Sequence, residues 1–271
     1  MSLPRRRLGR TGWLVGEVGL GAMDTPHSPQ AVETVETALD LGIDFVDTAR
    51  DYAGSEFLLG QVVRARGIAA FHIASKTFSH TIDGSQRDVD RSLSTLGVDQ
   101  IDVYQLHDIS TVEAWDRVHR EDGALAGLQA MQERGLIGHI GISTHSLEVL
   151  ERAVESDAFD TVMVEYSAFY PHAARLIEQA QARDIGVIVM RPLGGSGRTS
   201  EMRGRIAAGY DGILTPRNLL RYVLSHPGVS TVIPGARHPS RVIENVATAS
   251  ASIPLTAEER RELEAAAASL Y

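Results

Sequence analysis

The chain has 271 residues and a formal net charge of −9, from 26 basic and 35 acidic side chains. This balance argues against a nucleic-acid-binding protein, which normally carries a basic surface. The absence of cysteine excludes disulfides, a thiolate nucleophile and cysteine-ligated metals. No stretch approaches the roughly 20 apolar residues that span a bilayer, and no apolar run follows the first arginines as in a secretory signal, so we expect a cytoplasmic protein.

Local patterns predict alternating strands and helices along the chain. Turn residues between two short apolar runs predict a β-hairpin over 7–15. Beyond it, apolar residues at spacings of three and four predict helices, for example over 31–41 and 147–155, the latter starting after Ser146. A last helix is predicted over 256–270. The strands are predicted at 18–20, 43–46, 71–74, 101–106, 137–142, 162–165, 186–189 and 230–233.

Eight strand–helix alternations in a chain of this length are typical of a (β/α)8 barrel, also called a TIM barrel. A doubly wound sheet would normally place a Gly-x-Gly-x-x-Gly motif after an early strand, and none follows here. We therefore expect residues 1–271 to form one domain, a (β/α)8 barrel with an N-terminal β-hairpin and an extra C-terminal helix.

Lys76 is the only lysine of the chain, beside 25 arginines. A bias towards arginine explains the total but not the one lysine that remains, because a surface charge works equally well as arginine. A compact ammonium or a neutral amine is what arginine cannot supply. Lys76 is therefore a candidate functional residue.

Three consecutive predicted strands are followed by chemically versatile side chains, namely Asp47, Tyr52, Lys76 and His107. Singly, each has an ordinary explanation as a turn residue, a packed ring or a structural histidine. In a barrel they face the same mouth. There Asp47 would keep the ammonium of Lys76 charged, and that ammonium would lower the pKa of the Tyr52 phenol. With His107 as a second donor to a carbonyl oxygen, the sequence predicts a carbonyl-polarising site that lacks a reductant.

These residues belong to a longer pattern. It comprises Asp47-Thr-Ala-x-x-Tyr52-x-x-Ser55-Glu56, Ser75-Lys76, Leu106-His107, Gly141-Ile-Ser143, Pro192-Leu-Gly, Val232-Ile-Pro-Gly235 and Arg241-x-x-Glu244-Asn245. In this order the chain resembles the aldo-keto reductase superfamily over nearly its whole length. The resemblance implies an NADP-dependent oxidoreductase that reduces an aldehyde, ketone or sugar carbonyl to an alcohol, or runs the reverse. It also implies that Tyr52 is the general acid in reduction and the base in oxidation. Asp47 and Lys76 would tune it, and His107 would orient the carbonyl.

The same resemblance implies an NADPH or NADP cofactor, with NADH left open. A glycine-containing loop at 191–197 offers backbone amides to a pyrophosphate, and Arg237 and Arg241 offer cations to a 2′-phosphate. The expected cofactor contacts are Asp47, Ser143, Thr144, Met163, Met190, Arg191, Pro192, Leu193, Gly194, Gly195, Gly235, Arg237, Arg241, Glu244 and Asn245.

Several of these positions depart from the family pattern. Gly235 stands where many members carry a lysine, and Met190 or Arg191 stands where an aromatic ring often stacks on the nicotinamide. Thr144 and Met163 replace the usual asparagine and glutamine that hold the carboxamide. Because a methionine neither donates nor accepts well, one amide contact is expected to be missing or to come from another group.

On the substrate side, Met23, Phe78 and Asp108 are expected to line an open, moderately polar pocket. The insertion at 108–122 is expected to be either a lid or a surface loop with Trp115 packed beneath it, and Trp13 is expected in the core of the hairpin. The expected partner is a small-molecule carbonyl substrate, without nucleic acid, membrane or metal, and the expected assembly is a monomer or a weak oligomer.

Two alternatives remain open at this stage. A Schiff-base lyase would use Lys76 for imine chemistry, although a lysine paired with Asp47 is a poor nucleophile. A regulatory subunit would bind the cofactor without turnover, although an intact quartet argues against that. Borohydride trapping of Lys76 would support the first alternative, and turnover of any aldehyde would exclude the second.

Overall fold

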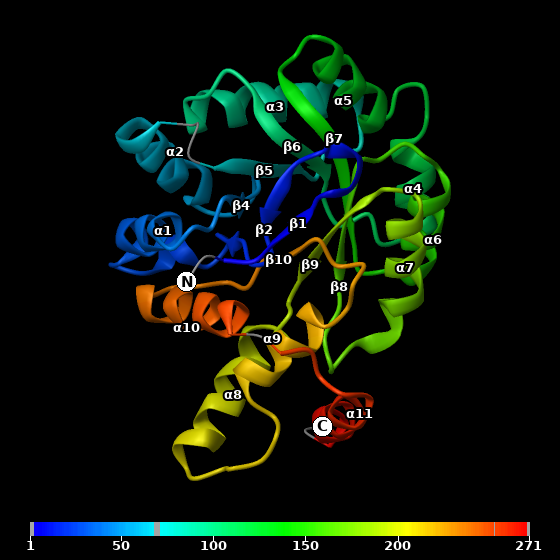
Figure 1. The fold of residues 1–271 in the computed structure, drawn as a ribbon. Coiled ribbons are helices and arrows are strands. Elements are labelled where there is room, and N and C mark those ends of the chain that lie inside the picture. The colour runs from blue at the N-terminus through cyan, green and yellow to red at the C-terminus, as the bar shows by residue number, and fades with distance from the viewer. Residues whose placement is uncertain (1–2, 68–70, 252, 270–271) are drawn as a thin grey trace.

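The computed structural model describes residues 3–67, 71–251 and 253–269. Parallel strands follow one another in chain order around a barrel, and helices surround them (Figure 1). The barrel strands are β3 (Leu20–Gly21), β4 (Phe45–Asp47), β5 (His72–Thr77), β6 (Ile101–Leu106), β7 (Ile137–Thr144), β8 (Thr161–Glu165), β9 (Gly186–Met190) and β10 (Thr231–Val232).

Backbone hydrogen bonds close the barrel between its first and last strands. The amide of Gly19 donates to the carbonyl of Val232 at 2.8 Å, and the amide of Val232 donates to the carbonyl of Glu17 at 2.9 Å. A second bridge joins Gly21 to Gly235. Closure pairs the edges that an open sheet would expose. The predicted (β/α)8 fold is confirmed.

Most of the helices form the outer ring of the barrel and cover its sheet, while the helix at 196–207 extends away from it (Figure 1). Among the described residues, no helix combines the length and apolar character needed to cross a membrane. The predicted start of one helix is confirmed, because the Ser146 hydroxyl accepts a hydrogen bond from the amide of Val149. The helices are α1 (Ala31–Asp40), α2 (Ser55–Arg66), α3 (Ile82–Leu96), α4 (Val112–Val118), α5 (Ala124–Glu133), α6 (Leu147–Glu155), α7 (Ala174–Ala182), α8 (Ser196–Ala207), α9 (Pro216–Leu224), α10 (Pro239–Ser250) and α11 (Ala257–Ala268).

The N-terminal hairpin plugs the end of the barrel where the strands begin. Its strands are β1 (Arg5–Arg7) and β2 (Leu14–Gly16), paired antiparallel. Leu8 and Val15 are fully buried and pack into the barrel interior, in one cluster with Phe45. Because this end is filled by side chains, the open end of the barrel is the one where the strands finish.

Several predicted boundaries differ from those of the structure. The strand expected at 18–20 is β3, two residues long and later in the chain, and the C-terminal helix ends at Ala268, while residues 270–271 lie outside the described residues. The expectation of a surface loop at 108–122 is wrong, because the helix α4 forms within this segment. Thr111 caps α4 by accepting from the Ala114 amide, and Trp115 is buried with only 9% of its surface exposed. The ring of Trp115 packs against His119 and Phe159, so it anchors α4 to the barrel.

Trp13 joins the hairpin to the bottom of the barrel. Its ring stacks on His72 at 4.1 Å and meets His139 edge-on at 4.7 Å. Each of these histidines also contacts a carboxylate through Nδ1, His72 that of Asp102 at 2.9 Å and His139 that of Asp160 at 3.0 Å. Trp13 therefore packs in the hairpin core, as expected from the sequence.

We predict that Trp13→Ala lowers the free energy of unfolding by about 2–3 kcal/mol, because it removes these ring contacts and opens a cavity under the hairpin. Equilibrium urea denaturation would measure the loss. Catalytic activity of the folded variant should stay close to that of the parent, because Trp13 lies at the closed end of the barrel. An unchanged urea midpoint of unfolding would show that the Trp13 ring does not stabilise the packing of the hairpin.

Candidate active site

The ends of neighbouring strands bring the predicted quartet together at the open end of the barrel. Asp47 is the last residue of β4, and Lys76 is the fifth residue of β5. Lys76 is fully buried and lies in register with Gln105 on β6. His107 directly follows β6, and its amide donates to the carbonyl of Thr77 at 2.9 Å. The closeness of these groups therefore follows from strand pairing.

A buried ion pair of Lys76 and Asp47 forms the base of the site. The ammonium Nζ donates to Asp47 Oδ2 at 2.6 Å and to the backbone carbonyl of Thr48 at 2.7 Å. The other carboxylate oxygen of Asp47 accepts from the Gln105 amide at 3.3 Å. Burial raises the pKa of Asp47 and lowers that of Lys76, because a low-dielectric interior disfavours each charge, while the pair itself opposes both shifts.

Tyr52 presents its hydroxyl to this ammonium. The phenolic oxygen lies 3.5 Å from Lys76 Nζ, and Nζ lies 4.7 Å from the centre of the ring. Two backbone bonds hold the turn that carries Tyr52, one from its own amide to the Ala49 carbonyl at 3.2 Å and one from the Ser55 amide to the Tyr52 carbonyl at 2.9 Å.

The predicted lowering of the Tyr52 pKa is wrong for this structure. Burial of the phenol, with the nearby carboxylates of Asp47 and Asp51, raises its pKa well above the usual value. The ammonium is 3.5 Å away and already donates to two other oxygens, so its attraction does not outweigh burial and the two carboxylates. The phenol therefore keeps its proton at neutral pH, as a proton donor must.

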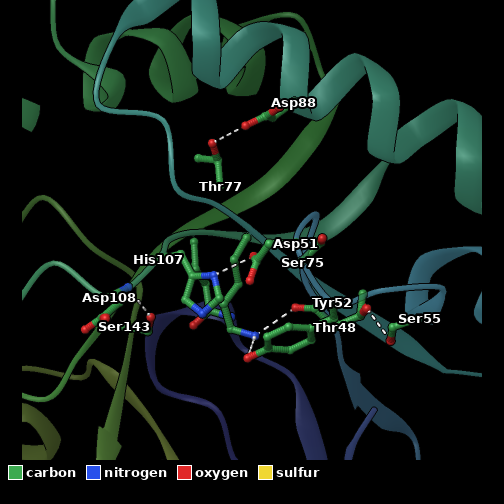
Figure 2. A network of polar contacts seen from close by, with 12 residues as sticks. Thr48, Asp51, Tyr52, Ser55, Ser75, Thr77, Asp88, His107, Asp108 and Ser143 are labelled. Atoms are coloured by element: carbon green, nitrogen blue, oxygen red, sulfur yellow. Dashed lines mark hydrogen bonds and ion pairs between the residues drawn. The ribbon is translucent and has the colours of Figure 1, made fainter. Parts of the chain in front are cut away.

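His107 is the fourth member of the quartet and lies beside the ring of Tyr52. Its ring lies edge-on to that of Tyr52, with centroids 5.5 Å apart, and is stacked on Phe78 at 4.0 Å. Its Nδ1 lies 2.9 Å from Oδ1 of Asp51. Figure 2 shows this nitrogen facing Asp51 and the rest of the ring on the side of the Tyr52 phenol. Sequence reasoning missed Asp51, although a carboxylate directly before Tyr52 was a visible signal.

A second polar network is centred on Glu56 and lies next to the strand that carries Lys76. Glu56 on α2 is 3% exposed, and its carboxylate accepts from the hydroxyl of Ser75 at 2.7 Å and that of Ser92 at 2.6 Å. Arg50 pairs with the same carboxylate. Because Ser75 precedes Lys76, this network fixes the strand that carries the ammonium.

The expected pocket residues lie at an open mouth. Met23 and Phe78 are about half exposed, at 50% and 48%, and Asp108 is exposed. The Asp108 amide donates to the hydroxyl oxygen of Ser143 at 2.9 Å (Figure 2). A separate groove between α1 and α2, lined by Val32 and Phe57 among others, contains none of the quartet. The quartet therefore lies at the barrel mouth and not in that groove.

The segment after β9 has the features of a phosphate-binding loop. Arg191, Gly194 and Gly195 have positive φ values of 51°, 83° and 88°, which suit glycine at the two later positions. Among the described side chains, none caps the N-terminus of α8, and the same holds for α10. The first turn of α8 therefore offers backbone amides to an anion. In α10, Pro239 has no N–H and the Arg241 amide donates to the His238 carbonyl at 3.0 Å, so the Ser240 amide is the one that remains in the first turn.

The segment after β10 adds open backbone and cations. A Cβ built on Gly235 would meet only the carbonyl oxygen of Gly21, at 3.8 Å, so packing does not require a glycine there. Glu244 is held between two arginines, Arg203 from α8 at 2.8 Å and Arg241 at 3.1 Å. Two guanidinium groups on one carboxylate leave a net positive charge beside the start of α10. Arg237 pairs with Asp24 at 3.4 Å, and Asn245 is buried. These groups fit a dinucleotide phosphate.

The three side chains expected to bind the carboxamide differ in whether they have an unused hydrogen-bond donor. The Ser143 oxygen accepts from Asp108, which leaves its hydroxyl hydrogen available. The Thr144 hydroxyl is buried and engaged in the turn before α6, where it donates to the Ser146 carbonyl at 3.4 Å and accepts from the Ser146 amide at 3.0 Å. Met163 is 2% exposed within the barrel interior. Ser143 is thus the one with a free donor.

An ion-pair cluster lies beside the mouth between β8 and β9. The carboxylate of Glu165 contacts His145 at 3.2 Å and Arg191 at 3.3 Å. Burial alone would raise the pKa of Glu165, but the hydrogen bond from His145 and the charge of Arg191 hold it below the usual value. Met190, at the end of β9, is partly buried against the interior cluster. Within residues 3–67, 71–251 and 253–269, no group of three or more His, Asp or Glu could hold a metal ion.

Comparison with known proteins places this geometry in a family. Residues 17–212 match the sequence model of the Aldo/keto reductase family. The chain belongs to the aldo/keto reductase family. Membership makes it an oxidoreductase.

Three similar proteins cover almost the whole chain. L-galactose dehydrogenase of Arabidopsis thaliana is 27% identical, with 96% of this chain and 93% of the relative covered. Among solved structures, a putative aldo-keto reductase from Pseudomonas aeruginosa is 28% identical, with a TM-score of 0.77 and coverage of 92% and 95%. An aldo-keto reductase from Klebsiella pneumoniae, solved in complex with NADPH, shares the fold at 24% identity, with a TM-score of 0.77 and coverage of 98% and 95%.

We predict that Lys76→Arg nearly abolishes carbonyl reduction, because a planar guanidinium cannot replace a compact ammonium between Asp47, the Thr48 carbonyl and Tyr52. Lys76→Met should in addition lower the free energy of unfolding by about 3–5 kcal/mol, because it leaves Asp47 buried and unpaired. Steady-state kinetics and urea denaturation would measure the two effects. The matched control is Arg66→Lys, which alters the surface pair with Asp40 and should change neither. Near-normal reduction by Lys76→Arg would contradict the role given to the ammonium.

Proposed function

We propose that the chain is an NADP(H)-dependent reductase of aldehyde, ketone or sugar carbonyls, able to run in reverse as an alcohol dehydrogenase. The observation that supports it most is the Tyr52 phenol, which keeps its proton and lies 3.5 Å from the ammonium of Lys76. His107 flanks the same phenol at the open end of the barrel. Membership of the aldo/keto reductase family supports the same reaction.

In reduction, Tyr52 donates its hydroxyl proton to the carbonyl oxygen as negative charge develops there. The phenolate that remains lies next to the Lys76 ammonium, whose charge stabilises it. Because Asp47 and the Thr48 carbonyl already hold Nζ, the ammonium needs no rearrangement during the reaction. In oxidation the same phenolate takes the proton of the alcohol. A bound nicotinamide supplies or accepts the hydride.

The residues that would hold the cofactor follow β9 and β10. The first turns of α8 and α10 would bind the phosphate oxygens, and Arg203, Arg237 and Arg241 would attract the extra charge of a 2′-phosphate. A relative from Schizosaccharomyces pombe carries NADP(+) in its name, and the Klebsiella pneumoniae structure contains NADPH. Both support NADP(H) in preference to NAD(H).

The Schiff-base alternative has less support. An imine-forming lysine must reach a substrate as a neutral amine. Lys76 is fully buried and donates to Asp47 and Thr48. The turnover test below separates the reductase from a regulatory subunit that only binds the cofactor.

We predict that Tyr52→Phe abolishes carbonyl reduction and leaves NADPH binding nearly unchanged, because only the proton donor is lost. Consumption of NADPH and of NADH, followed in parallel over a panel of aldehydes, ketones and aldoses, would measure activity. Fluorescence titration would measure binding of each nucleotide. A matched control is Tyr210→Phe, which alters a tyrosine on the segment after α8 that bonds the Leu214 amide. Loss of NADPH binding in Tyr52→Phe would show that the site has been misplaced.

For the nucleotide itself, we predict that Arg241→Ala raises the Kd for NADPH about tenfold and leaves the Kd for NADH unchanged, because a charge-assisted bond to the 2′-phosphate is lost. Isothermal titration calorimetry would measure both constants. The control is Arg175→Ala, which removes an exposed pair with Glu151 and should affect neither. An equal loss for both nucleotides would argue against a 2′-phosphate contact at Arg241.

A further inference from the structure

The carboxylate of Glu165 has no part yet in the proposed reaction. Its side chain is 12% exposed. Nδ1 of His145 lies 3.2 Å from its Oε2, and Nη1 of Arg191 lies 3.3 Å from the same oxygen, so Oε1 takes part in neither contact. A carboxylate accepts about four hydrogen bonds through its two oxygens. Glu165 therefore retains the capacity to accept a hydrogen bond from a ligand at the mouth.

Strand register places Glu165 at the open end of the barrel. Successive side chains of a strand point to opposite faces. Met163 belongs to the interior cluster, so Glu165, two residues later on β8, faces the same side and lies nearer to the mouth. Glu165 is in register with Met190 on β9, and Met163 is in register with Ser143 on β7. Glu165 therefore lies between the ends of β7 and β9.

The ends of these strands lie between the phenol and the candidate phosphate-binding segments. Around the barrel, β7 and β8 separate β6, which His107 follows, from β9, which the first of those segments follows. Burial and nearby carboxylates raise the pKa of the Tyr52 phenol, and the positive charge of Arg191 opposes them, so the Arg191 side chain is within electrostatic reach of the phenol. This is where the proposed function requires the nicotinamide.

The carboxamide of a nicotinamide needs both a donor and an acceptor from the protein. It carries two N–H donors and one carbonyl oxygen. The Ser143 hydroxyl can donate to the carbonyl, because its own oxygen accepts from the Asp108 amide. For the N–H donors, the thioethers of Met163 and Met190 are weak acceptors, and the Thr144 hydroxyl is engaged in the turn before α6. The acceptor must therefore come from another side chain.

Glu165 has the charge and the rigidity that such an acceptor needs. Burial raises its pKa, but the hydrogen bond from His145 and the charge of Arg191 outweigh burial and hold the pKa below its usual value. An ionised carboxylate only accepts hydrogen bonds, so it suits an N–H and would face a carbonyl oxygen unfavourably. His145 and Arg191 also hold the carboxylate in place before a ligand binds, which lowers the cost of binding.

We infer that Glu165 binds the nicotinamide carboxamide: its carboxylate accepts from an N–H of the amide, while the Ser143 hydroxyl donates to the amide carbonyl. This inference rests on the proposed function. It gives Glu165 the place on β8 that was expected for Met163. The two contacts distinguish the nitrogen of the amide from its oxygen, so together they fix the rotation of the carboxamide.

The first experiment compares two nucleotides that differ only in this group. In the acetylpyridine analogue of NADP+, a methyl ketone replaces the carboxamide, so the carbonyl is kept and the N–H donors are lost. Isothermal titration calorimetry would measure both Kd values for the parent protein and for Glu165→Leu. We expect the parent to bind NADP+ about tenfold more tightly than the analogue, and Glu165→Leu to bind the two equally. Both nucleotides carry the same ring charge, so the lost charge of Glu165 does not affect their ratio.

Two further variants separate the hydrogen bond from the support of the cluster. Glu165→Gln should keep part of the preference for NADP+, because an amide oxygen still accepts but forms a weaker bond than a carboxylate. Glu151→Leu removes an exposed glutamate that pairs with Arg175 and should change neither Kd. Equal binding of the two nucleotides by the parent would overturn the inference. So would an equal loss for both in Glu165→Leu, which would mean that Glu165 only holds Arg191 and His145.

The second experiment observes the amide directly and does not depend on the folding of Glu165→Leu. NMR of NADP+ carrying a ¹⁵N-labelled carboxamide would record its two N–H protons, free and bound. We expect one of them to move downfield on binding to the parent protein, and to move less on binding to Glu165→Gln, because a neutral acceptor forms the weaker bond. Equal shifts with the two proteins would overturn the inference.

The outcomes separate the two proposals, because neither experiment contains a carbonyl substrate. If the parent protein binds NADP+ with the expected preference but reduces no carbonyl, the proposed reduction fails and Glu165 keeps its role in binding. If the parent reduces carbonyls with NADPH but binds the acetylpyridine analogue as tightly as NADP+, only the inference fails. Binding of neither nucleotide would contradict both proposals.

Discussion

The ion pair of Lys76 and Asp47 is the constraint on which the rest of the site depends. Two charges removed from water are tolerated only where further polar groups surround them, and here the Thr48 carbonyl and the Gln105 amide do so. Thr48 directly follows β4 and Gln105 lies on β6, and these are the strands on either side of the one that carries Lys76. Correct strand pairing is thus required for a stable interior as well as for a competent site.

Barrel closure joins two halves that are distant in sequence. The quartet lies on or just after β4, β5 and β6, whereas the candidate phosphate-binding segments follow β9 and β10. The amide of Gly21, at the start of the ring, donates to the carbonyl of Pro234 at 3.2 Å. This bond places the segment that begins at Gly235 next to the strands of the quartet. The seam of the barrel is therefore also where the two halves of the site meet.

The sequence was sufficient for features with a local signal. The barrel followed from alternating periodicities, and the quartet followed from polar residues at strand ends. The packing of Trp115 and the direction in which the pKa of Tyr52 shifts could not be predicted equally well, because both depend on burial by segments distant in the chain. The pairing of Asp51 with His107 depends on the conformation of one turn, and the engagement of the Thr144 hydroxyl depends on the entry into α6. Neither conformation leaves a residue pattern that identifies it.

The solitary lysine has a practical consequence. Lys76 carries the only lysine amine in the 271 residues, and none of its surface is exposed. Acylating reagents that attack neutral amines can reach it only when the groups that bury it, the Tyr52 ring among them, move apart. Acylation of Lys76, read by mass spectrometry, would therefore count openings of the barrel in the native protein, at a single position that also reports on the integrity of the site.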